Sequence, residues 1–409
     1  MESEKSMTKN QHINVLTINS GSSSLKFALY DIGRQEKLLL SGAIDGIASH
    51  ACRFYIIDGN GDILLNQSLN TSNHEIAVVK LLRWLKKRDY LKVLDAVGHR
   101  VVHGGSRYFQ PHLVNTKLME QLHDLTAMSP DHLPQELGVI TTISQYQPDI
   151  KQVVCFDTAF HRNMPKLAQL YALPKSLKDE GVIRYGFHGL SYEYILGVLK
   201  KEFGNKTANG KVIIAHLGSG ASMAATNRGK SVETTMGFTP AGGLMMSTRS
   251  GDLDPGVIIY LLRQKNLRAS EVAEIVNKKA GLLGVSKISP DMKKLLEMKK
   301  NPNAVEAVNL FCYQAKKFLG SLAAVLGGLD TLVFTGGIGE NSPPIRKCIC
   351  KDMELFGIRL NKDRNNKNAP VISDGGSTVT VRVIKTNEQL MIARHTRNCL
   401  LKKKRKDIT

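Results

Sequence analysis

The sequence predicts an α/β protein made of two related domains. Its 409 residues exceed what a single hydrophobic core usually organises, so two domains are expected. An apolar helical pattern at 302–326 is followed by a strand at 331–335 and a glycine loop at 336–341, and an amphipathic helix is expected at 74–88. The order of helix, strand and glycine loop is typical of α/β proteins, in which ligands bind beyond the strand ends. In addition, a strand, a small-residue turn and a second strand occur once in each half of the chain, which suggests a duplication.

The first of these turns has the composition of a phosphate-binding site. Apolar strands at 15–18 and 25–30 flank a serine-rich turn with one glycine. Because side chains alternate along a strand, Ser22, Ser24 and Lys26 are expected to share one face. Two hydroxyls, a cation and exposed glycine backbone suit a phosphate chain. The alternative is a serine-rich hairpin tip that binds nothing.

The second turn repeats this arrangement. A strand at 212–215 leads into HLGSGAS at 216–222, and an extended run follows at 223–226. A duplicated domain would place one phosphate-facing hairpin on each side of a nucleotide. Chance similarity between two turns of glycine and serine is the competing explanation.

One further segment imitates a P-loop. Residues 224–231 have the sequence AATNRGKS, with alanine in place of the first glycine. A P-loop follows a strand directly and opens a helix. Here NRGK at 227–230 has the composition of a hairpin turn, so we expect a turn between strands at 222–226 and 231–235.

Composition narrows the class of protein. The formal charge is +20, and we interpret residues 402–409 as a solvated basic tail. Few aromatic residues accompany the basic runs, so nucleic-acid binding would rest on charge alone and is not expected. No apolar stretch approaches the ~18 residues that cross a bilayer, so no membrane partner is expected. The six scattered cysteines and the polar segment 1–11, which has no apolar signal-peptide core, predict reduced thiols and a cytoplasmic protein.

Eight motifs are distributed over nearly the whole chain. They are NSGSSSLKF (19–27), HRVVHGG (99–105), FDTAFH (156–161), RYGFHG (184–189), HLGSGAS (216–222), TMGFTPAGGLMMSTRSGDLDP (235–255), FTGGIGEN (334–341) and TNEQ (386–389). Together, and in this order, they resemble the acetokinase family of short-chain carboxylate kinases.

This resemblance implies a fold and an activity. The fold would be two actin-like (ribonuclease H-like) domains with a nucleotide cleft between them, as in the superfamily of acetate and sugar kinases, heat-shock chaperone ATPases and actin. The N-terminal domain would span 1–157 and be completed by a C-terminal helix at 387–401, and the second domain would span 158–386. The activity would be the reversible phosphorylation of acetate to acetyl phosphate by ATP, with ADP as the second product and Mg²⁺, or Mn²⁺ in its place, as the metal. A homodimer formed through the second domain is also implied.

Two arginines have the chemistry that this reaction needs. A carboxylate acceptor and a triphosphate repel each other, so cations must hold both. Arg100 precedes a pair of glycines and Arg249 precedes SGDLDP, which favours shaped loops over exposed helices, where a plain surface arginine would be the alternative. The resemblance implies that Arg100 contacts the substrate and that Arg249 stabilises the transition state.

A histidine and an aspartate complete the expected catalytic set. His188 lies among glycines, which let backbone approach a ligand closely. A lone histidine is usually structural, but the resemblance assigns to His188 a hydrogen bond to the phosphoryl group in transfer. Asp157 ends a strand at 153–156, and the resemblance places it near the metal or the nucleophile. We favour orientation and contact with a Mg²⁺-bound water over proton abstraction, because an acetate nucleophile already lacks its proton.

The resemblance also implies the binding residues. The acceptor acid would be bound by Arg100, Val102, His132, Phe187 and Pro240. The nucleotide would be contacted by Ser22, Ser24, Lys26, His216, Leu217, Gly218, Ser219, Gly220, Asp291, Met292, Lys293, Gly337, Ile338, Gly339, Glu340 and Asn341. Phosphates and waters should supply most ligands of the metal, with Asn19 and Glu388 at the metal-linked positions. Glu388 also fits the start of a helix, and both roles can hold together.

Three residues depart from the family pattern. Ser219 lies in a turn that usually contains asparagine, and Lys293 stands where arginine is common. Asp131 replaces an apolar residue of the acid pocket, where a carboxylate should repel a carboxylate substrate unless it turns away or pairs with a base. A propionate or butyrate kinase is the nearest alternative function. A weakly catalytic, nucleotide-binding regulatory protein is the second.

Overall fold

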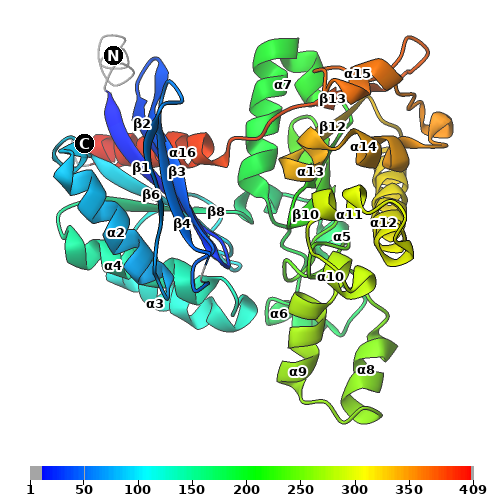
Figure 1. Ribbon diagram of the computed structural model, residues 1–409, viewed down its shortest axis with the longest axis horizontal. Helices are drawn as coiled ribbons and strands as arrows, with labels where there is room; N and C mark the ends of the chain where they lie inside the picture. The colour runs from blue at the N-terminus through cyan, green and yellow to red at the C-terminus, as the bar shows by residue number, and fades with distance from the viewer. Residues whose placement is uncertain (1–11, 50, 407–409) are drawn as a thin grey trace. The chain divides into compact units, whose positions relative to one another are not determined.

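Two compact units make up the chain in the computed structural model, which describes residues 12–49 and 51–406. The first unit comprises Met1–Ala159 and Asn387–Thr409, so the C-terminal end of the chain completes it. The second unit is the continuous segment Phe160–Thr386. Each unit has its own β-sheet (Figure 1).

The sheet of the first unit has eight strands in the order β5-β4-β3-β2-β1-β6-β8-β7. Strands β1 to β5 form an antiparallel meander, β1, β6 and β8 are parallel neighbours, and β7 is antiparallel to β8. The central strand β1 is buried along most of its length, which explains its nearly continuous apolar sequence. The strands are β1 (Ile13–Ser20), β2 (Ser24–Ile32), β3 (Glu36–Asp45), β4 (Arg53–Asp58), β5 (Ile63–Ser68), β6 (Ala96–Val101), β7 (His112–Leu113) and β8 (Lys151–Phe156).

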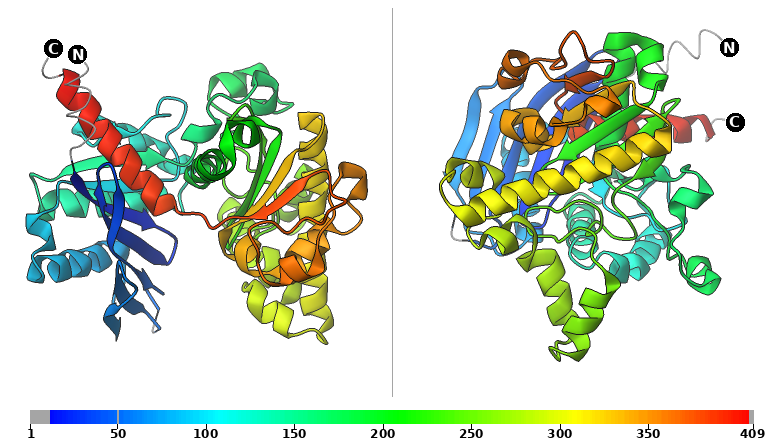
Figure 2. Two further views of the ribbon diagram at one scale, coloured as in Figure 1. Left: turned by 90° about the horizontal axis from the view of Figure 1, so that it is seen from above. Right: turned by 90° about the vertical axis from the view of Figure 1, so that its right-hand side faces the viewer.

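Helices cover both faces of this sheet. Helices α2 and α4 share one core with strands β1 to β4 and with Val97 of β6. The neighbouring Gly98 faces the other side, where Ile392 and Thr396 of α16 pack against it. Figure 2 shows α16, in red, lying along the sheet of this unit. The helices are α2 (His74–Lys87), η1 (Tyr90–Lys92), α3 (Thr116–Asp124), η2 (Leu125–Met128), α4 (Leu133–Tyr146) and α16 (Glu388–Lys406).

The sheet of the second unit has five strands in the order β11-β10-β9-β12-β13. Strands β9, β10 and β11 are antiparallel neighbours, whereas β9, β12 and β13 are parallel. The series β3-β2-β1-β6-β8 of the first sheet has the same directions at each step, so the expected duplication and the α/β fold class are confirmed. The strands are β9 (Val212–Leu217), β10 (Ala221–Asn227), β11 (Lys230–Thr234), β12 (Thr331–Thr335) and β13 (Thr380–Val383).

Two long helices cover the second sheet. Helix α7 (Gly189–Asn209) shares a core with β9, β10 and β12, and α12 (Pro302–Leu326) packs on the other side (Figure 2). The remaining helices are η3 (Ala159–His161), α5 (Lys166–Gln169), α6 (Lys175–Asp179), α8 (Pro255–Arg263), α9 (Ala269–Glu274), the π-helix η4 (Ile275–Lys279), α10 (Gly281–Ser286), α11 (Met292–Glu297), α13 (Gly336–Asn341), α14 (Pro343–Cys350), η5 (Glu354–Phe356) and α15 (Lys362–Asn366). In the described part of the chain, no helix combines the length and the apolar character that a membrane span needs.

Several sequence-based expectations match these elements. Helix α12 and strand β12 have the expected bounds, and α2 ends one residue before the expected helix does. The segment that imitates a P-loop is a hairpin, because Asn227 of β10 pairs with Lys230 of β11. Between them Arg228 and Gly229 have φ angles of 51° and 69°, as a two-residue hairpin turn requires.

One expected loop is a helix, and the C-terminal helix extends beyond its expected end at residue 401. Residues 336–341 form the short helix α13 instead of a glycine loop, because the Glu340 carboxylate accepts the N–H of Gly336 and satisfies the first turn. The expected tail at 402–409 is helical as far as Lys406, because no glycine or proline interrupts α16. Residues 407–409 lie outside the described part.

Replacing Gly98 by alanine should destabilise the first unit. The added Cβ would lie 2.2 Å from Thr396 Oγ1 and 2.7 Å from Ile392 Cγ2, so α16 would have to move. We expect a loss of about 1–3 kcal/mol in the free energy of unfolding, measured by urea titration. Gly197→Ala is the control, because nothing lies within 4 Å of its Cβ position on α7 and alanine should gain about 0.5–1 kcal/mol there. Equal stability of the two variants would contradict the packing described for α16.

Candidate functional site

The first group of expected site residues meets at one edge of the first sheet. Asn19 lies at the end of β1, Arg100 near the end of β6 and Asp157 just after β8, and these three strands run in the same direction. Glu388 begins α16 and reaches the same edge, where Asn19 Nδ2 donates a hydrogen bond of 3.0 Å to Glu388 Oε2. Residues from both ends of the chain are thus brought together.

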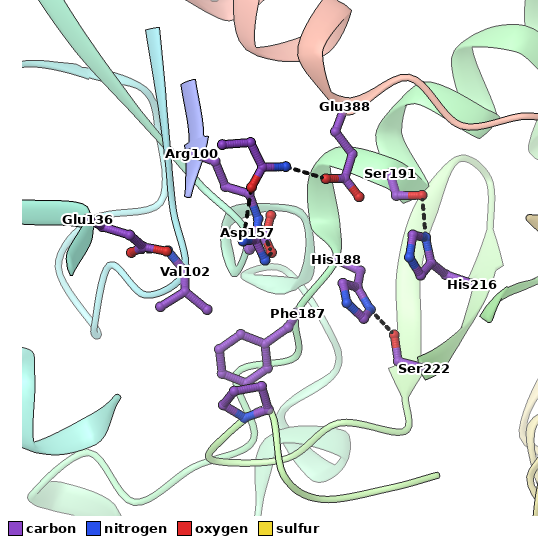
Figure 3. Close-up of polar contacts among 12 residues, drawn as sticks. Arg100, Val102, Glu136, Asp157, Phe187, His188, Ser191, His216, Ser222 and Glu388 are labelled. Atoms are coloured by element: carbon purple, nitrogen blue, oxygen red, sulfur yellow. Dashed lines mark hydrogen bonds and ion pairs between the residues drawn. The ribbon is translucent and has the colours of Figure 1, made fainter. Parts of the chain in front are cut away.

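Arg100 and Asp157 form a buried ion pair (Figure 3). Arg100 Nε donates to Asp157 Oδ2 over 2.9 Å, and Nη2 donates to the same oxygen. The side chain of Asp157 is 1% exposed and that of Arg100 is 14% exposed. Burial alone lowers the pKa of Arg100, but the charges of Asp157 and Glu388 outweigh it and raise that pKa. Arg100 is therefore a permanently charged and fixed guanidinium.

The side-chain oxygen atoms at this edge are of types that suit a Mg²⁺ ion bound mainly by phosphates. Glu388 offers a carboxylate and Asn19 an amide oxygen, which are ligand types that Mg²⁺ prefers. Within residues 12–49 and 51–406, no group of three or more His, Cys, Asp or Glu side chains is arranged to hold a metal.

A buried histidine holds the first glycine-serine turn. Gly21 N donates to Ser24 O over 2.8 Å, and His74 Nε2 at the start of α2 donates to Gly21 O over 2.8 Å. Ser24 and Lys26 lie on one face of β2, as expected, and Lys26 is exposed. Ser22 precedes β2 and is exposed in the turn, so its predicted place on that strand face is wrong.

A carboxyl group lies behind the expected acid-binding residues of the first unit. Val102 follows β6, and its N–H donates to Glu136 Oε2 over 3.0 Å. Glu136 lies in the first turn of α4, and its own N–H donates to the carbonyl of His132. Asp131, which precedes His132, is half-buried. Two residues expected to bind the acid are thus tied to one buried glutamate.

In the second unit, His188 has a left-handed backbone and a fixed ring. Its φ angle is 59°, and its Nδ1 lies 2.8 Å from Ser222 Oγ (Figure 3). Ser222 Oγ is also hydrogen-bonded to the hydroxyl of Tyr192. The rings of His188 and His216 stack with their centroids 4.3 Å apart. A Cβ added to Gly220 would lie 3.3 Å from His188 Nε2, so a larger residue would crowd that ring.

Arg249 lies beside the same glycine. The Cβ position of Gly220 is 3.8 Å from Arg249 Nη1, and this nitrogen donates to the carbonyl of Pro240 over 3.1 Å. Because Gly220 has no side chain, the Arg249 guanidinium and Nε2 of the His188 ring both lie next to the space that a Cβ would fill. Two of the expected catalytic residues therefore come together.

The two expected nucleotide segments of this unit are neighbours. Strands β9 and β12 are parallel, and His216 is opposite Thr335. A Cβ on Gly218 would lie 3.9 Å from the backbone nitrogen of Gly337. The backbone of the glycine turn after β9 thus approaches the N-terminus of α13, where backbone N–H groups favour anions.

A hydrogen-bond network supports these segments. Ser191 Oγ lies 2.8 Å from His216 Nδ1 and 2.8 Å from Thr386 Oγ1 (Figure 3 shows the first contact). Glu340 Oε1 accepts the N–H groups of Gly336 and Thr386 over 2.8 and 3.0 Å. The Glu340 carboxylate therefore binds backbone of its own unit.

Other expected site residues also have structural partners. Phe187 is 1% exposed, and its carbonyl accepts a bond from His161 Nε2. Burial lowers the pKa of His161 to about 4, so this histidine is neutral. Asp291 caps α11 by accepting the N–H of Lys293, whereas Met292 is buried. Lys293, like Asp291, is exposed.

Four residues that were not predicted from the sequence support the site. Ser222 could have been found, because it pairs with His216 across the hairpin of the motif HLGSGAS. Glu136 and Ser191 gave no signal in the sequence, because each is one of several polar residues in its helix. Arg346 is fully buried and donates to the carbonyls of α13 at Gly339 and Glu340 over 2.8 and 3.0 Å.

The five-strand series that the two sheets share, with polar glycine turns at the strand ends, places the protein in the actin-like fold class. The model of the Acetokinase family matches residues 14–394, and the chain belongs to this family. It is 44% identical over 387 residues to the acetate kinase of Rhodopseudomonas palustris (strain TIE-1). The aligned region covers 93% of this chain and 97% of that relative. The predicted family, fold class and enzyme class are therefore confirmed.

Solved structures give the same result. The acetate kinase of Porphyromonas gingivalis has a TM-score of 0.83 and 37% identity, over 95% of this chain and all of that chain (100%). A propionate kinase from Francisella tularensis subsp. tularensis SCHU S4 has a TM-score of 0.88 and 34% identity, over 94% of this chain and 99% of that one.

Removal of one partner of the buried ion pair should be costly. Asp157→Leu leaves the Arg100 guanidinium without its carboxylate, and we expect a loss of about 3–5 kcal/mol in urea unfolding. The double variant Asp157→Leu/Arg100→Met replaces both charges with apolar groups and should recover most of this loss. A double variant as unstable as the single one would show that the pair is not the cause.

Proposed function

We propose that this protein is an acetate kinase, which transfers the γ-phosphoryl group of ATP directly and reversibly to acetate and forms acetyl phosphate and ADP. Membership of the acetokinase family over nearly the whole chain, with 44% identity to an acetate kinase, carries this proposal. The site residues below are part of the proposal, and each is supported by its contacts.

His188 and Arg249 are proposed to stabilise the phosphoryl group in transfer. If the Tyr192 hydroxyl donates to Ser222 and Ser222 donates to Nδ1 of His188, the proton of the neutral ring is on Nε2. This N–H is then a donor beside Gly220, with Arg249 Nη1 close to the same point. Preorganised donors of this kind act on the charge that develops in the transition state.

Arg100 is proposed to bind the carboxylate of acetate, and Asp157 to orient Arg100. The ion pair fixes the guanidinium plane, which favours a defined pose of a carboxylate bound at Nη1, the nitrogen that here donates to Asn19 Oδ1 over 3.4 Å. Val102, His132, Phe187 and Pro240 complete the proposed acid-binding set. No proton needs to be removed, because acetate is already ionised near neutral pH.

Asn19 and Glu388 are proposed to hold Mg²⁺ together with phosphates and waters. A metal bound there would neutralise negative charge on the phosphates. The nucleotide is proposed to contact Ser22, Ser24, Lys26, the turn 216–220, residues 291–293 and residues 337–341. The approach of Gly218 to Gly337 supports this assignment for the second unit.

We propose further that the two units are the two domains of the kinase and that the protein is a cytoplasmic homodimer. Helix α8 supports a partner surface on the second unit, because none of its residues is buried although its sequence is mainly apolar. Ile259 is 50% exposed and Tyr260 is 49% exposed, which leaves a single helix with an apolar surface facing outward. The described cysteines are free thiols, which suits a reducing compartment.

A kinetic comparison of short acids tests the proposed substrate. Acyl phosphate formed from ATP is trapped with hydroxylamine for acetate, propionate and butyrate, and we expect the highest kcat/KM with acetate. The similarity to a propionate kinase structure makes propionate the main competitor. A higher kcat/KM with propionate would overturn the acetate assignment, and ATP binding without turnover of any acid would favour the regulatory alternative.

Substitution of Arg249 tests the proposed transition-state contact. Arg249→Ala should lower kcat by about 100-fold or more and leave ATP affinity nearly unchanged, because the contact acts mainly on the group in transfer. Arg83→Ala, which removes an exposed arginine of α2, is the matched control and should keep normal turnover. Near-normal kcat in Arg249→Ala would show that the role is assigned wrongly.

A further inference from the structure

Glu136 is a buried carboxyl group for which the catalytic scheme has no role. It is 2% exposed, and its Oε2 accepts the N–H of Val102 (Figure 3). Its Oε1 has no hydrogen-bond partner among the described residues. A charged carboxylate oxygen without a donor is costly in the interior, so the geometry favours the neutral acid.

The charges around Glu136 make its protonation state important. Arg100 and Asp157, in the sheet behind α4, act on it with opposite signs and already neutralise each other. His132 lies directly before α4, and Glu75 of α2 reaches this helix near Gly138. If Glu136 ionises, the group formed with Arg100 and Asp157 gains a net negative charge.

We propose that Glu136 is a positioning residue that sets the affinity for the acceptor acid: as a neutral acid it holds the backbone of Val102, and as a carboxylate it repels the incoming acid. This inference rests on the proposed function. Burial raises the pKa of Glu136 to about 7, although Arg100 and the Val102 N–H oppose this effect. The switch between the two states therefore falls near neutral pH.

The pH dependence of KM tests this role. Acetate remains ionised between pH 6 and 8, so its own charge does not change. KM for acetate of the unaltered enzyme should rise severalfold across this interval, whereas KM for ATP should not follow it. In Glu136→Gln, which keeps an oxygen for the Val102 N–H but cannot ionise, KM for acetate should stay low across the whole interval.

Glu75→Gln is the matched control. It removes a half-buried carboxylate from α2 that is not bonded to Val102, and it should reproduce the unaltered pH profile. A KM for acetate that is constant between pH 6 and 8 in the unaltered enzyme would overturn the proposal. An unchanged pH profile in Glu136→Gln would overturn it as well.

Thermal unfolding gives a readout that does not need activity. The native state keeps the Glu136 proton up to pH about 7, whereas the unfolded chain loses it near 4.5. The native state then binds more protons in this interval, so Glu136 makes stability fall as pH rises from about 4.5 to 7. The midpoint of Glu136→Gln should fall less across this interval, and an identical decline in both proteins would overturn the inferred neutral state. If no acid yields acyl phosphate, the proposed function fails, and this experiment still decides the state of Glu136.

Discussion

The parallel pairing of the central strands is the constraint on which the candidate site depends. Because β1, β6 and β8 run in one direction, Asn19, Arg100 and Asp157 reach the same edge of the first sheet. In the second unit the same rule places His216 and the start of α13 side by side. Antiparallel pairing at these positions would send successive strand ends to opposite edges, and the polar groups would be separated by the length of a strand.

Burying ionisable groups at the first edge is costly unless their charge is offset, and the structure offsets it in two ways. Arg100 is matched by Asp157, so the pair stays ionised inside the protein. Among the described residues, Glu136 forms no ion pair, and its hydrogen bond comes from the N–H of Val102, so a bound proton removes the charge that would otherwise be buried. In the second unit, His188 and His216 are positioned by neutral hydroxyl groups. The two units thus orient polar side chains by different means.

Local sequence patterns predicted the features that depend on local sequence. Helix α12, strand β12 and the turn at 227–230 follow from helical spacing, an apolar run and a glycine at positive φ. The role of Glu136 could not be predicted, because its burial comes from packing of α4 on a sheet formed by distant segments. The helix α13 was missed for a similar reason, since glycines disfavour a helix until the Glu340 carboxylate caps its first turn.

Helix α16 has a consequence for biosynthesis. The second unit is one continuous segment, so all its strands are available once residue 386 has been made. The first unit lacks α16 until residues 388–406 have been made, although its strands are synthesised first. Asn19 forms its hydrogen bond with Glu388 only after Glu388 has been made, and the two residues are 369 positions apart in the sequence. Until then Ile392 and Thr396 do not cover the face of β6 at Gly98. The apolar surface exposed in the nascent chain favours misassembly or chaperone binding.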